Sequence, residues 1–172
     1  FRRVLFRSMV DVNALKYSNQ RTQDVILRKA GNEAVQIFGN KNEDFLEAVK
    51  LLIERGFDHI DINLGCPVKK IIRAGKGSAL LLESDFVKEL LLKLKKEFRN
   101  DIKLSMKIRT GYKNFSDPEY YVKLAEEYGL FQICIHGRTQ EQLYSGQADW
   151  NIIKKMNLKF LQTVRVITQA GC

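Results

Sequence analysis

The stretch from Asp61 to Leu81, DINLGCPVKKIIRAGKGSALL, decides how the rest of the chain is interpreted. It begins with strand-like alternation, places Cys66 just before Pro67 where that strand should end, and continues into a glycine-rich loop. A buried cysteine is usually a small hydrophobic residue, so a functional thiol needs support from the rest of the chain. The loop matches neither a P-loop nor a dinucleotide-binding fingerprint. Gly75 and Gly77 can equally serve turns with positive φ.

Strands and helices alternate along the chain on both sides of this stretch. The patterns predict strands over residues 33–38, 58–65, 102–111 and 131–137, and helices over 40–56, 84–98, 116–129 and from 149 onward. Ser84 and Ser116 are the expected N-caps, the latter in a capping box, and Gly56 and Gly129 the expected helix ends. Strands that alternate with helices at this spacing predict a parallel sheet, and 172 residues suit one domain.

Each predicted strand alternates apolar residues with small or polar ones, which bears on the fold class. The polar residues that come late in their strands are Gln36, Asn63, Lys107 and His136. Strands of an open doubly wound sheet are covered on both faces and tend to be apolar throughout. The pattern therefore favours a βα barrel whose polar strand ends meet at the carboxyl-terminal mouth. Taken singly, each residue could instead be a core hydrogen-bonding group, although Lys107 would be costly to bury without a partner.

Composition and charge limit the class of protein. The formal charge is +9, and it would be +6 without the three arginines of residues 1–8, FRRVLFRS. This excess favours a polyanionic partner, although scattered cations on helices are usually only solvated. Cys66, Cys134 and Cys172 have no CxxC spacing, so we expect neither a disulfide framework nor a metal site. With no signal peptide and no long apolar run, we expect a cytoplasmic protein that does not enter a membrane.

Four motifs occur together in an order and spacing that carry a family resemblance. They are VQIFG (35–39), DINLGCPVKKIIRAGKGSALL (61–81), MKIRTGY (106–112) and IHGRTQEQLYSGQADW (135–150). From about Met9 to Met156 the chain closely resembles the tRNA-dihydrouridine synthase family. The resemblance implies a TIM (β/α)8 barrel that binds FMN. It also implies reduction of the C5=C6 bond of particular uridines in tRNA, with NADPH as the reductant.

The resemblance also implies roles for individual residues. Cys66 matches the cysteine that protonates C5 of the uracil, a role for which an ordinary thiol keeps its proton at neutral pH; the alternative is an inert thiol in the turn. Three positions match residues that hold the flavin: Gln36, Lys107 and His136. Asn63 and Arg138 match residues near the flavin and the substrate base. Tyr144 has two interpretations, closure of the substrate side or packing against Trp150. The target base is expected to leave the folded tRNA to enter such a site.

The two ends of the chain depart from the family pattern. We interpret residues 1–8 as an artefact or scar, residues 9–156 as a partial TIM-barrel FMN-binding catalytic domain, and residues 157–172 as a divergent or truncated tail. Residues 163–171, TVRVITQAG, have the composition of a strand without the family's phosphate-binding sequence. The fold class is therefore expected to be an incomplete TIM barrel, comprising strands two to six or seven of eight. Such a chain should bind FMN weakly, aggregate readily and be inactive in isolation.

Other functions remain open at this point. One is an FMN oxidoreductase like dihydroorotate or dihydropyrimidine dehydrogenase, which acts on a free pyrimidine. Another is a non-catalytic RNA-binding remnant that uses its basic surface without flavin, and a third is a fragment with no function of its own. The sequence predicts neither the oligomeric state nor which uridine of the tRNA is modified.

Overall fold

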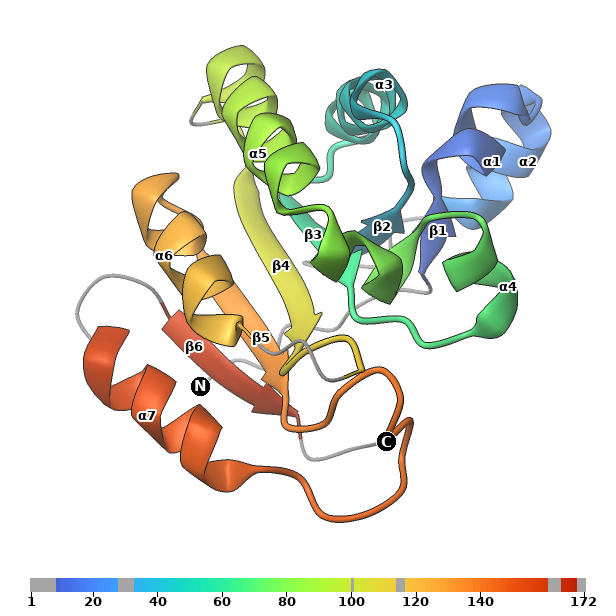
Figure 1. The fold of residues 1–172 in the computed structure, drawn as a ribbon. Helices are drawn as coiled ribbons and strands as arrows, with labels where there is room; N and C mark the ends of the chain where they lie inside the picture. Colours follow the sequence, from blue (N-terminus) through green and yellow to red (C-terminus); the bar gives the residue numbers. More distant parts are fainter. Residues whose placement is uncertain (1–8, 28–32, 100, 114–116, 161–164, 170–172) are drawn as a thin grey trace.

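The computed structural model contains a six-stranded parallel sheet flanked by helices (Figure 1). It describes residues 9–27, 33–99, 101–113, 117–160 and 165–169. The strands are β1 (Val10–Asp11), β2 (Val35–Phe38), β3 (His59–Leu64), β4 (Lys103–Arg109), β5 (Gln132–His136) and β6 (Arg165–Gln169). They lie in the order of the sequence, and every neighbouring pair is parallel.

The helices connect successive strands and run along one side of the sheet (Figure 1). They are α1 (Val12–Tyr17), α2 (Gln20–Ile26), α3 (Asn42–Glu54), α4 (Lys69–Arg73), the 3-10 helix η1 (Gly77–Leu82), α5 (Ser84–Phe98), α6 (Pro118–Glu127) and α7 (Trp150–Phe160). Strand and helix alternation is confirmed, and the strand predicted near the carboxyl end is β6. In the described residues the sheet is open, with β1 and β6 at its edges. This is the architecture of an incomplete TIM barrel.

The helix starts differ from two expectations. The prediction that Ser84 caps α5 is wrong, because the helix already includes Ser84 and its N-cap is Glu83, which makes no side-chain cap bond. Only Glu83 separates η1 from α5, which leaves no room for an extended cap at Ser84. Ser116 lies outside the described residues, and Asp117 caps α6 by accepting a hydrogen bond from the backbone N–H of Tyr120 at 3.0 Å.

The core lies between the sheet and the helices. Alternate residues of the central strands point toward the helices and are buried, among them Ile62, Met106 and Ile135. Leu52 of α3 and Leu91 of α5 are fully buried in the same cluster. Because strand side chains alternate between faces, packing these apolar residues under the helices directs the intervening polar residues to the other face. That face forms the interior of the incomplete barrel.

Candidate active site

The polar residues of the strands lie in registered rows on the interior face. Directly paired residues of parallel strands point to the same side of a sheet, so the register identifies each row. One row contains Gln36, Asp61, Ser105 and Gln132, and the next row toward the carboxyl ends contains Asn63, Lys107 and Cys134. Arg109 and His136 form the last pair. The predicted convergence of Gln36, Asn63, Lys107 and His136 at one face is therefore present.

A buried hydrogen-bond network holds the first two rows together. The Gln36 amide donates from Nε2 to the Asp61 carboxylate at 2.6 Å and accepts at Oε1 from Asn63 Nδ2 at 2.7 Å. The Ser105 hydroxyl donates to the other Asp61 oxygen at 2.6 Å. Burial raises the pKa of Asp61 to about 6, although the bonds from Ser105 and Gln36 and the charge of Lys107 act in the opposite direction. Sequence patterning placed Asp61 on this face but did not predict its network.

The side chain of Asn63 also holds the turn that carries Cys66. Its Oδ1 accepts hydrogen bonds from the backbone N–H groups of Gly65 at 3.1 Å and Cys66 at 2.9 Å. From the other side, the buried Ser78 hydroxyl donates to the Cys66 carbonyl at 2.8 Å, and the Ser78 N–H donates to the same oxygen at 3.2 Å. Gly77 has a φ of +62°, and a Cβ there would lie 3.0 Å from both Cβ and O of Cys66. The thiol is therefore placed at the carboxyl end of β3 by two separate segments.

Lys107 is half-buried on the interior face and is suited to hold an anionic group. Its charge acts on Asp61, but its ammonium makes no hydrogen bond or salt bridge with a described residue. The amides of Gln36 and Asn63 are mostly engaged with each other, with Asp61 and with the Cys66 turn. Within this polar row, Lys107 is thus the group most available to an anionic cofactor or substrate.

His136 is buried beside three cations and is neutral at physiological pH. Burial and the charges of Arg109, Lys107 and Arg138 lower its pKa to about 4. Its Nε2 lies 3.4 Å from Arg138 Nη1. A guanidinium can only donate, so Nε2 accepts and the proton of the neutral ring resides on Nδ1. His136 therefore offers a neutral N–H donor, and it does not add a positive charge to the site.

Arg109 joins two loops at the mouth and was not predicted from the sequence. Its Nε donates to the Gly65 carbonyl at 2.8 Å, and its Nη1 donates to the carbonyls of Thr139 at 3.0 Å and Leu143 at 2.8 Å. Burial lowers its pKa, while attraction to Tyr144 and Cys66 opposes that shift. A signal was present in the sequence, because Arg109 follows Lys107 by two residues and shares its face of the strand.

Tyr144 lies over these groups at the mouth. Its ring is 5.6 Å from the guanidinium carbon of Arg109 and 6.2 Å from the His136 ring, measured to ring centroids. The ring is largely exposed, as is Trp150. Tyr144 thus lies beside Arg109 and His136, and its role in closing the substrate side stays a prediction.

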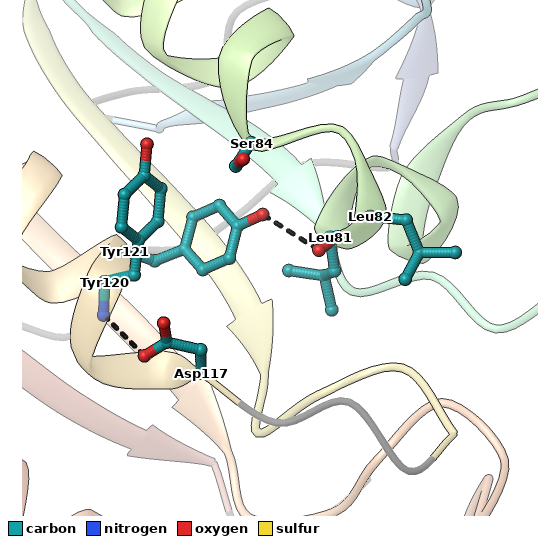
Figure 2. A pocket seen from close by; sticks show the side chains of 6 residues that line it. All are labelled: Leu81, Leu82, Ser84, Asp117, Tyr120 and Tyr121. Carbon is teal, nitrogen blue, oxygen red and sulfur yellow. Dashed lines mark hydrogen bonds between the residues drawn. The ribbon is translucent and has the colours of Figure 1, made fainter.

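A separate pocket of about 280 Å³ is lined by residues of η1, the start of α5 and the first turn of α6 (Figure 2). Two of its polar side chains, Tyr121 and Asp117, have structural partners. The Tyr121 hydroxyl donates to the Leu81 carbonyl at 3.1 Å, and Asp117 caps α6 through the Tyr120 N–H (Figure 2). This pocket therefore contributes packing between η1 and α6 rather than a second polar site.

Metal-binding clusters and membrane-spanning helices are both absent from the described residues. No group of three or more His, Cys, Asp or Glu side chains in that part of the chain could hold a metal ion. Among the helices in the described ranges, none combines the length and apolar character required to cross a membrane.

Comparison with protein families agrees with this geometry. The family model described as "Dihydrouridine synthase (Dus)" matches residues 2–169, nearly the whole chain. The chain belongs to the dihydrouridine synthase family. The match favours this family over the dihydroorotate-dehydrogenase-like alternative. It also extends over residues 2–8, which lie outside the described residues, and over part of the 157–172 segment.

Three curated relatives carry the name "tRNA-dihydrouridine synthase B". The protein of Pasteurella multocida (strain Pm70) is 39% identical over 128 residues, which are 74% of this chain and 38% of that protein. The Escherichia coli (strain K12) protein is 36% identical over 140 residues, covering 81% of this chain and 43% of the relative. The Klebsiella pneumoniae protein is 37% identical over 144 residues, with the same two shares. The chain thus spans about two-fifths of the length of these relatives.

Proposed function

We propose that this chain carries part of the catalytic domain of an FMN-dependent tRNA-dihydrouridine synthase that uses NADPH as reductant. The relatives' name supports tRNA as the substrate. The observation that carries the proposal is the placement of the Cys66 thiol by Asn63 and Ser78 beside the cationic strand ends. Lys107 and His136 are the groups we assign to the flavin, together with Gln36. We assign Asn63 and Arg138, which contacts His136, to the substrate base.

The proposed reaction adds one hydride and one proton across the C5=C6 bond of uracil. When bound, a reduced flavin supplies the hydride for C6. Cys66 donates its proton to C5, so the double bond becomes a single bond and a thiolate remains. The nearby Arg109 cation stabilises that thiolate by direct attraction, and a proton from solvent restores the thiol. With a flavin bound, NADPH would supply the two electrons, as a hydride, that a further cycle requires.

The residues present fit an anionic, hydrogen-bonding cofactor such as a flavin. The Lys107 ammonium is available on the interior face, and the inferred Nδ1–H of His136 can donate to a ring oxygen or nitrogen. A cation beside the ring system is one way in which a protein tunes a flavin. Gln36 and Ser105 supply the hydrogen bonds to the buried Asp61, and the Lys107 ammonium, whose charge also acts on Asp61, makes no hydrogen bond with a described residue.

The proposal is tested by dihydrouridine formation in unmodified tRNA with excess FMN and NADPH. We expect Cys66→Ala to lower the rate by about 10² to 10⁴ while flavin binding is retained, because general acid catalysis has this magnitude. Cys134→Ala is the matched control: this second buried thiol lies on β5, and burial raises its pKa to about 11. If the unaltered chain forms dihydrouridine, an equal rate for Cys66→Ala would contradict the acid role. No turnover by either protein would instead match the expectation that the chain is inactive in isolation. Turnover of free uracil with none on tRNA would contradict the substrate.

A further inference from the structure

A second pocket, of about 400 Å³, lies at the mouth of the incomplete barrel, and none of the roles above uses it. It is formed by the loops that follow β3, β4 and β5. Its lining residues are Pro67, Lys69, Ile72, Arg73, Tyr112, Lys113, Gln140, Glu141 and Leu143. A volume of this order suits one nucleotide, since small-ligand pockets span about 300 to 1,000 Å³.

The lining combines exposed cations with apolar and aromatic side chains. Lys69, Arg73 and Lys113 are exposed, and Glu141 is the one acidic residue among those that line the pocket. Tyr112 is partly buried and packs against the hydrophobic core, so its ring has a supported position. Cations beside a supported aromatic ring are the arrangement that binds single-stranded nucleic acid, with phosphates on the cations and a base on the ring.

The pocket adjoins the candidate thiol through two connections. Pro67, on its wall, directly follows Cys66. The carbonyl of Leu143, another lining residue, accepts from Arg109, which also donates to the Gly65 carbonyl in the Cys66 turn. Two lining residues, Lys113 and Leu143, have positive φ values of 49° and 52°. Non-glycine residues in this region carry strain and are concentrated at functional sites.

We propose that this pocket binds one nucleotide of the RNA strand next to the target uridine. Lys69, Arg73 and Lys113 would contact its phosphates, and its base would lie against Tyr112. The inference rests on the proposed function, because it assigns the pocket to the RNA that delivers uridine to Cys66. Holding the neighbouring nucleotide here stabilises a strand whose target base has left its stack, which is a requirement for chemistry on that base.

The test measures binding of a fluorescein-labelled oligouridine to the 172-residue chain by fluorescence anisotropy, across a salt titration. The pocket variant combines Lys69→Gln, Arg73→Gln and Lys113→Gln. Its matched control combines Lys50→Gln, Lys88→Gln and Lys96→Gln, three exposed positions on the outer helices α3 and α5. Both variants lose the same charge, and circular dichroism verifies that each is folded. Tyr112→Leu tests the stacking contact separately.

We expect the pocket variant to weaken RNA binding at least tenfold. It should also lower the slope of log Kd against log salt by about 2, because each of the three lost phosphate contacts contributes about 0.7 to this slope on a single strand. The control variant should change Kd by less than about threefold, and Tyr112→Leu should weaken binding without changing the salt slope. Single substitutions Arg73→Gln and Lys113→Gln provide the same comparison if the triple variant does not fold.

Equal losses in the two triple variants would overturn the proposal, as would an absence of RNA binding by the unaltered chain. A second result would also overturn the proposal: NADPH, but not NADH, displaces the labelled oligouridine, while RNA binding does not depend on the pocket residues. That result would assign the pocket to the additional phosphate of NADPH. The result is independent of catalysis: pocket-dependent RNA binding with no dihydrouridine formed would leave this inference standing while the proposed function failed. If dihydrouridine forms but RNA binding does not depend on the pocket residues, the proposed function stands and this inference fails.

Discussion

The side-chain oxygen of Asn63 accepts a hydrogen bond from the backbone N–H of Cys66 at 2.9 Å, so the strand that precedes the candidate thiol also positions it. The same oxygen accepts from Gly65, and the Asn63 amide nitrogen donates to Gln36. The position of the Cys66 turn is thereby connected to β2 through one side chain. This relationship gives Asn63 a structural role in addition to the one that the family resemblance implied.

Replacing Asn63 by alanine should loosen the Cys66 turn. Two buried backbone N–H groups lose their acceptor, which should lower the free energy of unfolding by about 2 to 4 kcal/mol. Asn63→Asp keeps the acceptor and should preserve the turn, although it loses the donor to Gln36. Hydrogen exchange at the amides of residues 65 and 66, with urea unfolding, provides the measurement. Asn40→Ala is the control, because Asn40 makes an exposed hydrogen bond to the Ala74 carbonyl. Unchanged exchange at residues 65 and 66 in Asn63→Ala would contradict this role.

Replacing Gly77 by alanine should destabilise the chain through contact with Cys66. A Cβ at Gly77 would lie 3.0 Å from both Cβ and O of Cys66, and the backbone oxygen cannot move freely. Gly129 also has a positive φ, +56°, with nothing within 4 Å of the added Cβ. Gly129→Ala therefore measures the backbone penalty alone, about 1 kcal/mol, and Gly77→Ala should cost about 1 to 3 kcal/mol more. Equal urea midpoints for the two variants would show that the contact with Cys66 is unimportant.

Replacing Asp61 by asparagine should raise stability at pH 7 to 8. The pKa of the folded carboxyl, about 6, lies above its ordinary value of 3.8. Its contribution is therefore fully present below pH 3.8 and is lost as the pH rises through 6. Removing the charge should add roughly 1 to 3 kcal/mol at pH 8. Asparagine can accept from Gln36 and donate to Ser105, whose hydroxyl can reverse its role. Urea unfolding at pH 8 measures the effect, and a less stable Asp61→Asn variant would contradict it.

The two histidines should make stability depend on pH in the opposite direction to Asp61. The Asp61→Asn variant removes the Asp61 contribution, so that the contribution of the histidines can be measured. Burial is the main cause that lowers the pKa of His59 and of His136 to about 4. Their unfolded forms bind protons below about pH 6.5, so stability is lost as the pH falls from 6.5 toward 4. In the unaltered chain protonation of Asp61 offsets part of this loss. The free energy of unfolding should therefore decrease more steeply between pH 7 and pH 5 in Asp61→Asn than in the unaltered chain. Parallel curves for the two proteins would contradict the opposing contributions of Asp61 and the histidines.

Shortening Arg109 should free the loop after β5. Arg109→Met leaves the carbonyls of Gly65, Thr139 and Leu143 without this donor, and we expect a loss of about 2 to 4 kcal/mol. Arg109→Lys should recover only part of this lost free energy of unfolding, because a single ammonium does not reproduce the several donors of the guanidinium group. Hydrogen exchange should increase over residues 139–143 and at residue 65. As a control, Arg138→Met should affect residues 145 and 146, whose carbonyls Arg138 contacts, and should leave residue 65 unchanged. An identical exchange pattern in both variants would argue against the specific connection.

The strand and helix alternation was predictable because it depends on local periodicity. Apolar residues at alternate positions of β3, β4 and β5 predicted both the sheet and the polar interior face. Helix starts were less predictable. The prediction for Ser84 failed because η1 extends to Leu82, and a 3-10 helix of this kind leaves no clear periodic signal in the sequence.

The sequence by itself determined the order of the elements, the face on which Gln36, Asn63, Lys107 and His136 lie, and the family to which the four motifs belong. These properties depend on side-chain type and spacing along the chain. Only the tertiary structure decided which groups meet. Arg109 reaches Thr139 and Leu143, Ser78 reaches Cys66, and three loops enclose the pocket beside the thiol, because the parallel sheet brings the carboxyl ends of separate strands to one edge. No local pattern encodes contacts between residues that far apart in the chain.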